Sequence, residues 1–254
     1  MKALSGSALS VTVALVTAGA GTGCGGEGNT DELGRLHLSA RAPAGQAGAG
    51  YAGTVQPLGL STDRDGVVYV PSSYTGDRMP LELLLHGAGA NGRDLVPLFN
   101  ESADREGFLI LAPDSRARTW DAIHGELGPD VAFIESALNE VLANFAIDPR
   151  RLSLAGFSDG ASYALTLGTT NGDLFPHIMA FSPCRARTLT PRGRPSIFVS
   201  HGTRDEVLVI DHCSRALVPK LKANGYNVAY EEFDGGHTVP PEIAQKAIQW
   251  WAGD

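Results

Sequence analysis

The stretch Arg151-Leu-Ser-Leu-Ala-Gly-Phe-Ser158-Asp-Gly-Ala161 carries the pentapeptide G-x-S-x-G between a short apolar run and an alanine-rich segment. Such flanks predict a strand, a sharp turn and a helix, with Ser158 on the turn. Gly156 and Gly160 suit this turn, because a side chain two positions from the serine would collide with neighbouring backbone. The pentapeptide alone is weak evidence for a nucleophile, because glycine occupies 31 of the 254 positions and the pattern can arise by chance. Together with its flanks, it indicates a nucleophilic serine.

The rest of the chain repeats this alternation of strand and helix. From residue 81 onward, short continuous apolar runs alternate with longer amphipathic stretches, which is typical of parallel strands buried on both faces and joined by crossover helices. We expect strands at 81–85, 108–112, 152–157, 178–181, 197–200 and 228–233, and helices at 129–144, 161–168, 214–224 and 240–251. Two edge strands are expected before them, at 36–40 and 66–70. The predicted fold class is α/β, with about eight mostly parallel strands and helices on both faces.

Length and charge limit the classes of partner. The length of 254 residues suffices for one domain with a full core. Acidic groups outnumber basic ones by 28 to 20, which argues against nucleic acid or an anionic membrane surface as the main partner. No basic run is suited to follow a phosphate backbone. We therefore expect a small-molecule or polymeric substrate without strong charge, and nothing in the sequence indicates an oligomeric state.

The first 24 residues have the features of an export signal. Lys2 supplies the charged start, residues 8–18 form a short apolar core, and small residues follow. The core is too short to cross a bilayer. Ala18-Gly19-Ala20 fits an ordinary cleavage site, whereas Gly21-Thr22-Gly23-Cys24 is similar to a lipoprotein lipobox without its usual leucine. The protein is thus expected to be exported, either secreted or held in the cell envelope or periplasm by a lipid on Cys24.

The export signal leaves one linker and one domain. Residues 25–34 are small, polar and rich in glycine, so we expect a flexible linker there and an α/β domain over residues 35–254. Within the domain only Cys184 and Cys213 remain. An oxidising compartment would allow them to form a disulfide, and two separate buried thiols are the alternative.

A nucleophilic serine needs a base and a carboxylate that orients the base. Asp205 ends the run Ser-His-Gly-Thr-Arg-Asp after a predicted strand, and His237 lies in Asp-Gly-Gly-His after the last one. Both positions are at the carboxyl ends of parallel strands, where open α/β sheets bind ligands. Asp211 and Glu206 are rival carboxylates, and Asp234 is too close to His237 along the chain to orient it.

An acyl-transfer site also needs two backbone N–H groups for the developing oxyanion. The run Leu83-Leu-Leu-His86-Gly-Ala-Gly-Ala-Asn91 ends a predicted strand in a turn of small residues. The N–H groups of Ala88 and Asp159 are the expected donors. His86, Gly87 and Trp120 are candidate substrate contacts. For His86 and for His201 we favour hydrogen bonding to local backbone over proton transfer, and simple packing is an equal alternative for Trp120.

Four motifs occur in order along the chain, namely Leu-Leu-His86-Gly, Gly-Phe-Ser158-Asp-Gly, His201-Gly-Thr-Arg-Asp205 and Gly-Gly-His237-Thr-Val-Pro. Over residues 67–251 the chain resembles α/β-hydrolase serine esterases of the phospholipase/carboxylesterase and dienelactone-hydrolase type, and polyhydroxybutyrate-depolymerase-like and feruloyl-esterase-like proteins. The resemblance implies that Ser158 is the nucleophile, Asp205 the acid member and His237 the base. It also implies an oxyanion hole at Gly87 and Ala88.

The expected activity is hydrolysis of carboxylic esters of small to medium acyl or aryl groups through an acyl-enzyme. Residues 184–194 form only a short segment where such proteins carry a lid, so no large lid is expected. The sequence has no H-E-x-x-H motif or paired cysteines that indicate a metal, and this chemistry needs no cofactor. The alternatives are an extracellular polyhydroxyalkanoate depolymerase, a feruloyl or acetyl-xylan esterase and, from another class, a non-catalytic surface-tethered binding protein.

Overall fold

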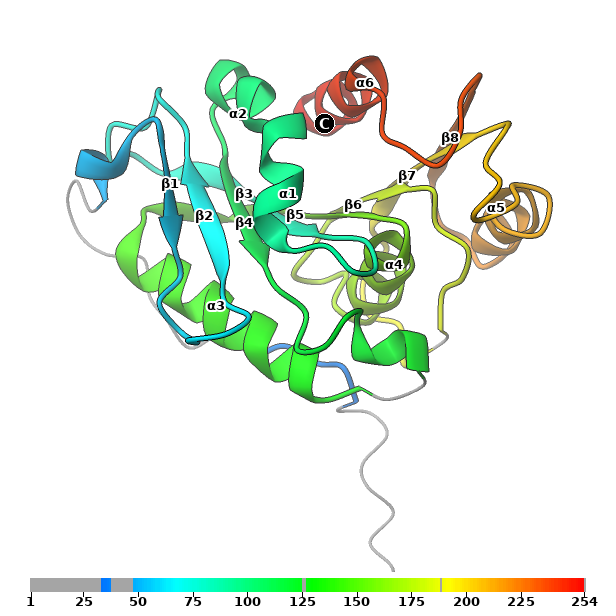
Figure 1. The fold of residues 1–254 in the computed structure, drawn as a ribbon, viewed down its shortest axis with the longest axis horizontal. Helices are drawn as coiled ribbons and strands as arrows, with labels where there is room; N and C mark the ends of the chain where they lie inside the picture. Colours follow the sequence, from blue (N-terminus) through cyan, green and yellow to red (C-terminus); the bar gives the residue numbers. More distant parts are fainter. Residues whose placement is uncertain (1–32, 38–47, 125–126, 188, 254) are drawn as a thin grey trace, which may run out of the picture.

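The sheet that organises the molecule is seen in a computed structural model, which describes residues 33–37, 48–124, 127–187 and 189–253. The predicted export signal, Cys24 and nearly all of the predicted linker lie outside these residues. Eight strands form one sheet in the order β1-β2-β4-β3-β5-β6-β7-β8 (Figure 1). The strands are β1 (Thr54–Pro57), β2 (Gly66–Val70), β3 (Met79–Leu85), β4 (Leu109–Pro113), β5 (Ile147–Phe157), β6 (His177–Phe181), β7 (Ser196–Gly202) and β8 (Val228–Phe233).

The direction of the strands follows the sequence pattern. β2 pairs antiparallel with both β1 and β4 at one side of the sheet, and the strands from β3 to β8 pair parallel to one another. All five residues of β4 are buried, as expected for an inner strand that is covered on both faces of the sheet. The predicted mostly parallel sheet of about eight strands is therefore confirmed.

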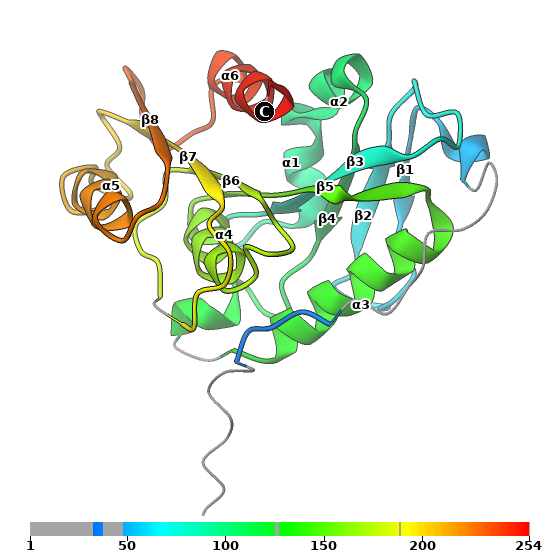
Figure 2. The same ribbon diagram turned by 180° about the vertical axis from the view of Figure 1, so that it is seen from behind.

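Helices cover both faces of the sheet (Figures 1 and 2). One face is covered by α3 (Pro129–Asn144), α4 (Asp159–Thr170) and α5 (Ser214–Ala223). The opposite face is covered by α1 (Gly92–Leu95), α2 (Asn100–Glu106) and α6 (Pro241–Ala252). Each face buries its own apolar cluster, because successive side chains of a strand point to opposite sides. Short 3-10 turns lie at Ala49–Tyr51, Val96–Leu98 and Asp121–His124.

The prediction of a first edge strand at 36–40 is wrong for the part that the structure describes. Residues 35–37 are not in a strand, and residues 38–40 lie outside the described residues. The backbone N–H of Leu36 donates to Asn171 Oδ1, and Arg35 forms an ion pair with Asp173. These bonds hold the segment against the end of α4. The edge strand is instead β1.

The described part of the predicted lid region runs along α4, because the N–H groups of Cys184 and Arg187 donate to hydroxyls of Ser162 and Thr166. Among the described residues, no helix has the length and apolar character needed to cross a bilayer.

Candidate active site

Ser158 occupies the turn between β5 and α4. Its backbone has φ of 58° and ψ of −119°, a left-handed conformation that is rare for residues with a side chain. The turn is tight: a Cβ atom on Gly156 would lie 2.3 Å from the carbonyl oxygen of Gly160, and one on Gly160 would lie 2.2 Å from that of Leu85. The structure thus confirms the expected strand, strained turn and helix around the serine.

His237 connects Ser158 to Asp205 by two hydrogen bonds. Its Nε2 lies 2.8 Å from Ser158 Oγ, and its Nδ1 lies 2.6 Å from Asp205 Oδ2. A carboxylate only accepts hydrogen bonds, so Nδ1 carries the proton and Nε2 is left to accept the hydroxyl proton of Ser158. Three residues that are far apart in the sequence therefore meet in the geometry of a nucleophile, a base and an orienting carboxylate.

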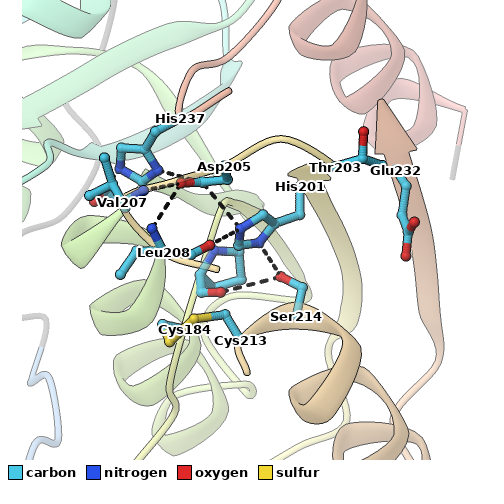
Figure 3. A network of polar contacts seen from close by, with 12 residues as sticks. Cys184, His201, Thr203, Asp205, Val207, Leu208, Cys213, Ser214, Glu232 and His237 are labelled. Carbon is cyan, nitrogen blue, oxygen red and sulfur yellow. Dashed lines mark hydrogen bonds and ion pairs between the residues drawn. A yellow bond between two sulfur atoms is a disulfide. The ribbon is translucent and has the colours of Figure 1, made fainter. Parts of the chain in front are cut away.

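The carboxylate of Asp205 is buried and supplied with donors. The backbone N–H groups of Val207 and Leu208 donate to Oδ1 at 2.9 and 2.8 Å, while His237 donates to Oδ2 (Figure 3). Burial alone would raise the pKa of Asp205, but the Leu208 amide, His237 and the Val207 amide outweigh it, and the pKa lies below its usual value. The group is therefore an anion at neutral pH.

The other carboxylates that the sequence offered as partners of His237 are not bonded to it in the described chain. Asp211 accepts a hydrogen bond from Arg215 at 2.9 Å, and Asp234 forms an ion pair with Arg204 at 3.1 Å. Among the described residues, the only side-chain carboxylate bonded to His237 is that of Asp205.

The expected oxyanion donors lie beside the nucleophile. A side chain on Gly87 would place its Cβ atom 3.3 Å from Ser158 Cβ, so the turn after β3 passes directly over the serine. Neither the N–H of Ala88 nor that of Asp159 has a hydrogen-bond partner within the described parts of the chain. Asp159 begins α4, where the first N–H groups of a helix have no intrahelical acceptor. Both amides are therefore available to a substrate oxygen.

The buried side chain of His86 stabilises this turn by hydrogen bonds. Its Nδ1 donates to the carbonyl oxygen of Gly87 at 2.7 Å, and its Nε2 accepts from the N–H of Ser115 at 3.0 Å. Because a trans peptide is planar, holding the Gly87 carbonyl toward His86 turns the N–H of Ala88 the other way. Burial lowers the pKa of His86, partly opposed by its bond to Gly87, so the ring is a neutral donor at one nitrogen and an acceptor at the other.

The expectation that His86 and Trp120 contact substrate needs correction. Both side chains are fully buried. Trp120 stacks on Tyr163, and its Nε1 donates to the backbone oxygen of His86 at 2.8 Å. The packing alternative thus fits Trp120, and His86 shapes the backbone instead of touching a ligand. Of the three candidate contacts, Gly87 alone belongs to the turn beside Ser158.

The structure joins Cys184 and Cys213 in a disulfide (Figure 3). The bond links the segment after β6 to the residue just before α5. Pro183 and Ser214, the neighbours of the two cysteines, are themselves connected, because Ser214 Oγ lies 3.2 Å from the Pro183 oxygen.

The side chains of the nucleophile and the base are largely buried. Ser158 is only 8% exposed and the His237 side chain 15%, whereas Val207 and Val209, just beyond Asp205, are 68% and 45% exposed. Cavities of about 370 and 360 Å³ lie elsewhere, one between β1 and α3 and one beside α5. In the described parts of the chain, no group of three or more His, Cys, Asp or Glu residues is arranged to hold a metal ion.

Sequence reasoning missed residues that form hydrogen bonds to the residues around Ser158. Ser115 supports His86, and Thr119 donates to the Asp159 carboxylate at 2.8 Å. Neither residue lies in a recognisable motif, because each acts through contacts that only the folded chain creates. The one available signal was their position in the loop after a predicted strand, on the same edge as Ser158.

Comparisons with known proteins find esterase family models and esterases among the relatives. Residues 65–184 match the family model described as "Esterase PHB depolymerase", and residues 131–241 match one described as "Putative esterase". The bifunctional acetylxylan esterase/xylanase XynS20E of Neocallimastix patriciarum is 32% identical over 158 residues, and an acetylxylan esterase of Coprinopsis cinerea is 29% identical over 145 residues. These matches cover 57% and 52% of this chain but only 22% and 38% of the relatives.

Solved structures extend the likeness to the whole fold. The ferulic acid esterase AmCE1/Fae1A of Anaeromyces mucronatus matches with a TM-score of 0.65 and 18% identity, over 87% of this chain and all of that one. At this identity the match speaks for the fold alone. Together with the family models, it confirms the predicted resemblance to α/β-hydrolase esterases.

Proposed function

We propose that this α/β-hydrolase-fold protein, a relative of esterases, is itself a serine hydrolase of carboxylic esters with small to medium acyl or aryl groups. The observation that carries the proposal is the continuous line of hydrogen bonds from Ser158 through His237 to Asp205. It stands at the carboxyl edge of a parallel sheet, where such folds bind ligands.

In the proposed reaction, Ser158 Oγ attacks the carbonyl carbon of the ester as His237 Nε2 takes the hydroxyl proton. Asp205 holds the ring in its Nδ1–H form and stabilises the imidazolium that results. The tetrahedral intermediate collapses, His237 returns the proton to the leaving alcohol, and the acyl group stays on Ser158. Water then attacks the acyl carbon, its proton goes to His237 and then to Ser158 Oγ, and the carboxylic acid leaves.

The negative oxygen of each tetrahedral intermediate is proposed to lie between the N–H groups of Ala88 and Asp159. Their lack of partners in the described chain supports this role. Loss of one such donor costs about 2.7 to 4 kcal/mol of transition-state stabilisation. No metal or cofactor is needed for these steps.

Within ester hydrolysis, the names of the relatives favour deacylation of a plant polysaccharide, with acetyl or feruloyl groups as the acyl part. A panel of acetyl-xylan, feruloyl esters, polyhydroxybutyrate and p-nitrophenyl esters of increasing chain length separates these substrates. Faster turnover of long-chain esters or of polyhydroxybutyrate would contradict the preference.

The predicted export signal fits an enzyme that meets polymeric esters outside the cytoplasm. We propose that the mature protein is exported and begins after residue 20 or at a lipidated Cys24. Mass spectrometry of the mature N-terminus distinguishes the two, and an N-terminus at Met1 would contradict export by cleavage.

The direct test of the function is Ser158→Ala. Removal of the nucleophile is expected to lower kcat for an activated short-chain ester by about 10⁶-fold, with the thermal midpoint unchanged. Ser153→Ala is a matched control, since it removes a buried hydroxyl on β5 away from the site. Retained activity in the Ser158 variant would refute the assignment of the nucleophile, whereas absence of ester hydrolysis in the unmodified protein would favour the non-catalytic binding protein.

A further inference from the structure

A second histidine contacts the carboxylate of the triad. His201, on β7, is fully buried, and its Nε2 lies 3.1 Å from Asp205 Oδ2, the same oxygen that His237 Nδ1 approaches at 2.6 Å. Figure 3 shows the carboxylate between the two rings. The proposed ester hydrolysis does not use His201, although the ring is as close to Asp205 as a hydrogen bond requires.

The partners of His201 define where its proton lies. Nε2 is also 2.7 Å from the carbonyl oxygen of Leu208, and a carbonyl only accepts, so Nε2 carries a proton. The Leu208 oxygen accepts this N–H, and Asp205 Oδ2 lies 3.1 Å from the same nitrogen. On the other side of the ring, Nδ1 lies 2.6 Å from Ser214 Oγ.

The ring is neutral in this setting. Burial lowers the pKa of His201, although the Leu208 carbonyl and Asp205 act in the opposite direction. Nδ1 of a neutral ring with a proton on Nε2 is an acceptor, so the Ser214 hydroxyl donates to it in preference to the Pro183 oxygen, which is further away at 3.2 Å. A neutral donor can hold Asp205 in place without competing with His237 for its negative charge.

Ser214, which bonds to Nδ1 of His201, is itself held in place by its neighbours. Ser214 begins α5, Pro183 follows β6, and the Cys184–Cys213 disulfide joins the two segments next to them. The hydroxyl that orients His201 is therefore held by a covalent link between separate parts of the sheet edge. Val207, Leu208 and His237 donate three hydrogen bonds to Asp205, and His201 Nε2 is a fourth nitrogen at 3.1 Å from the carboxylate.

We propose that His201 is a positioning residue for the triad: its Nε2–H, oriented by Ser214 and the Cys184–Cys213 link, holds Asp205 Oδ2 in the plane that His237 requires. The inference rests on the proposed ester hydrolysis for its kinetic consequence. Its structural content, the neutral Nε2–H form of a ring bonded to the triad carboxylate, stands apart from that activity.

The sharpest kinetic test compares two amide substitutions. In His201→Gln the side-chain amide reaches the place of Nε2 and can donate to Asp205, whereas the shorter amide of His201→Asn reaches only the place of Nδ1 and Ser214. We expect the Asn variant to lose about 10- to 100-fold in kcat at nearly unchanged KM, as for loss of a hydrogen bond to a charged group. The Gln variant should recover most of this loss. A merely structural role would impair both alike, and equal values for the two variants would overturn the proposal.

A second pair covers the case in which the Asn variant fails to fold. Ser214→Ala removes the hydroxyl that orients the ring and is expected to lower kcat about 3- to 10-fold, while Ser214→Thr keeps it and should retain activity. Ser153→Ala, the same change at a buried serine away from the site, is the control and should leave kcat unchanged. An unaffected Ser214→Ala enzyme would contradict the proposed anchoring.

NMR of protein labelled with ¹⁵N-histidine tests the arrangement without any substrate. We expect His201 to give the signals of a neutral ring protonated at Nε2 near pH 7, and the His237 Nδ1–H signal to shift in His201→Asn but not in His201→Gln. A doubly protonated or Nδ1-protonated His201 would overturn the proposal. If the unmodified protein hydrolyses no ester, the proposed function fails, and these spectra still decide the role of His201.

Discussion

Asp205 and Glu82 are two buried carboxyl groups of the same sheet in opposite surroundings. Asp205, at the carboxyl edge, is met by backbone and histidine donors and has a lowered pKa. Glu82, in the middle of β3, is fully buried, and neither of its oxygens has a hydrogen-bond partner within the described chain. Burial raises its pKa to about 8. Burial alone therefore does not decide the charge of a carboxyl group here; the supply of donors does.

The contrast separates function from packing. A carboxylate that must orient a base has to stay ionised, and the fold provides donors for it at the edge where the strands end. Glu82 lies on the face covered by α6, beside Ser153 on the next strand, whose hydroxyl has no partner among the described residues. Because none of the described groups donates to its carboxylate, Glu82 is held as the neutral acid below about pH 8.

Among the substitutions that test the contrast between Asp205 and Glu82, the largest expected effect is on kcat. Asp205→Asn keeps the shape of the side chain, but its amide favours the wrong tautomer of His237, and we expect kcat to fall by about 10⁴-fold. Glu82→Gln is the matched substitution in the second carboxyl group and should leave kcat unchanged. Steady-state kinetics with an activated short-chain ester measures both. Equal losses in the two variants would remove the distinction between the groups.

The next effect concerns stability at rising pH. Folding raises the pKa of Glu82 from 4.5 to about 8, so its stabilising contribution is complete below its unfolded pKa and is lost as pH rises through the folded value. The free energy of unfolding of the unmodified protein should therefore fall relative to Glu82→Gln by about 2 to 4 kcal/mol between about pH 5 and pH 8. Urea unfolding at a series of pH values measures the difference.

Ser153→Ala is the control for this series, because it changes the neighbour of Glu82 in the sheet without removing a titrating group. Its pH dependence should match that of the unmodified protein. A constant difference between the Glu82→Gln variant and the unmodified protein across this range would show that Glu82 does not titrate abnormally.

The smallest expected effect is on stability at low pH, and its dependence on pH is opposite to that of Glu82. The folded pKa of Asp205 is lowered, so its contribution to stability is present above the unfolded pKa of about 3.9 and is lost as pH falls through the folded value. Asp205→Asn should therefore lose less stability than the unmodified protein on acidification. The same urea series, extended below pH 4, makes the comparison. A steeper acid loss in the Asn variant would contradict the lowered pKa.

Sequence reasoning located the residues that lie in recognisable local motifs or directly after a predicted strand. The flanks of Ser158 specify its turn, and the bounds of α3 agree with its apolar periodicity and its first-turn Pro129. Asp205 and His237 were found because each follows a predicted strand, and the rule that such loops share one edge brought them together.

What sequence reasoning could not supply depends on contacts across the fold. The alternation near Leu36 suggested a strand, but the backbone N–H of this residue donates to Asn171 Oδ1 at the end of α4. His86 and His201 are each followed by glycine at a strand end, and only the positions of Ser115 and Ser214 reveal that both rings support the site. The isolation of Glu82 is equally invisible, because its place between leucines does not tell which donors surround it.

The central claim is that Asp205 and His237 make the Ser158 hydroxyl reactive. A fluorophosphonate probe followed by peptide mass spectrometry tests this most directly, since the probe reacts with activated serines and reports the site without any choice of substrate. We predict one modified residue, Ser158, in the unmodified protein and in Glu82→Gln, with strongly slowed labelling in Asp205→Asn. Labelling of a different serine, or none, would contradict the account.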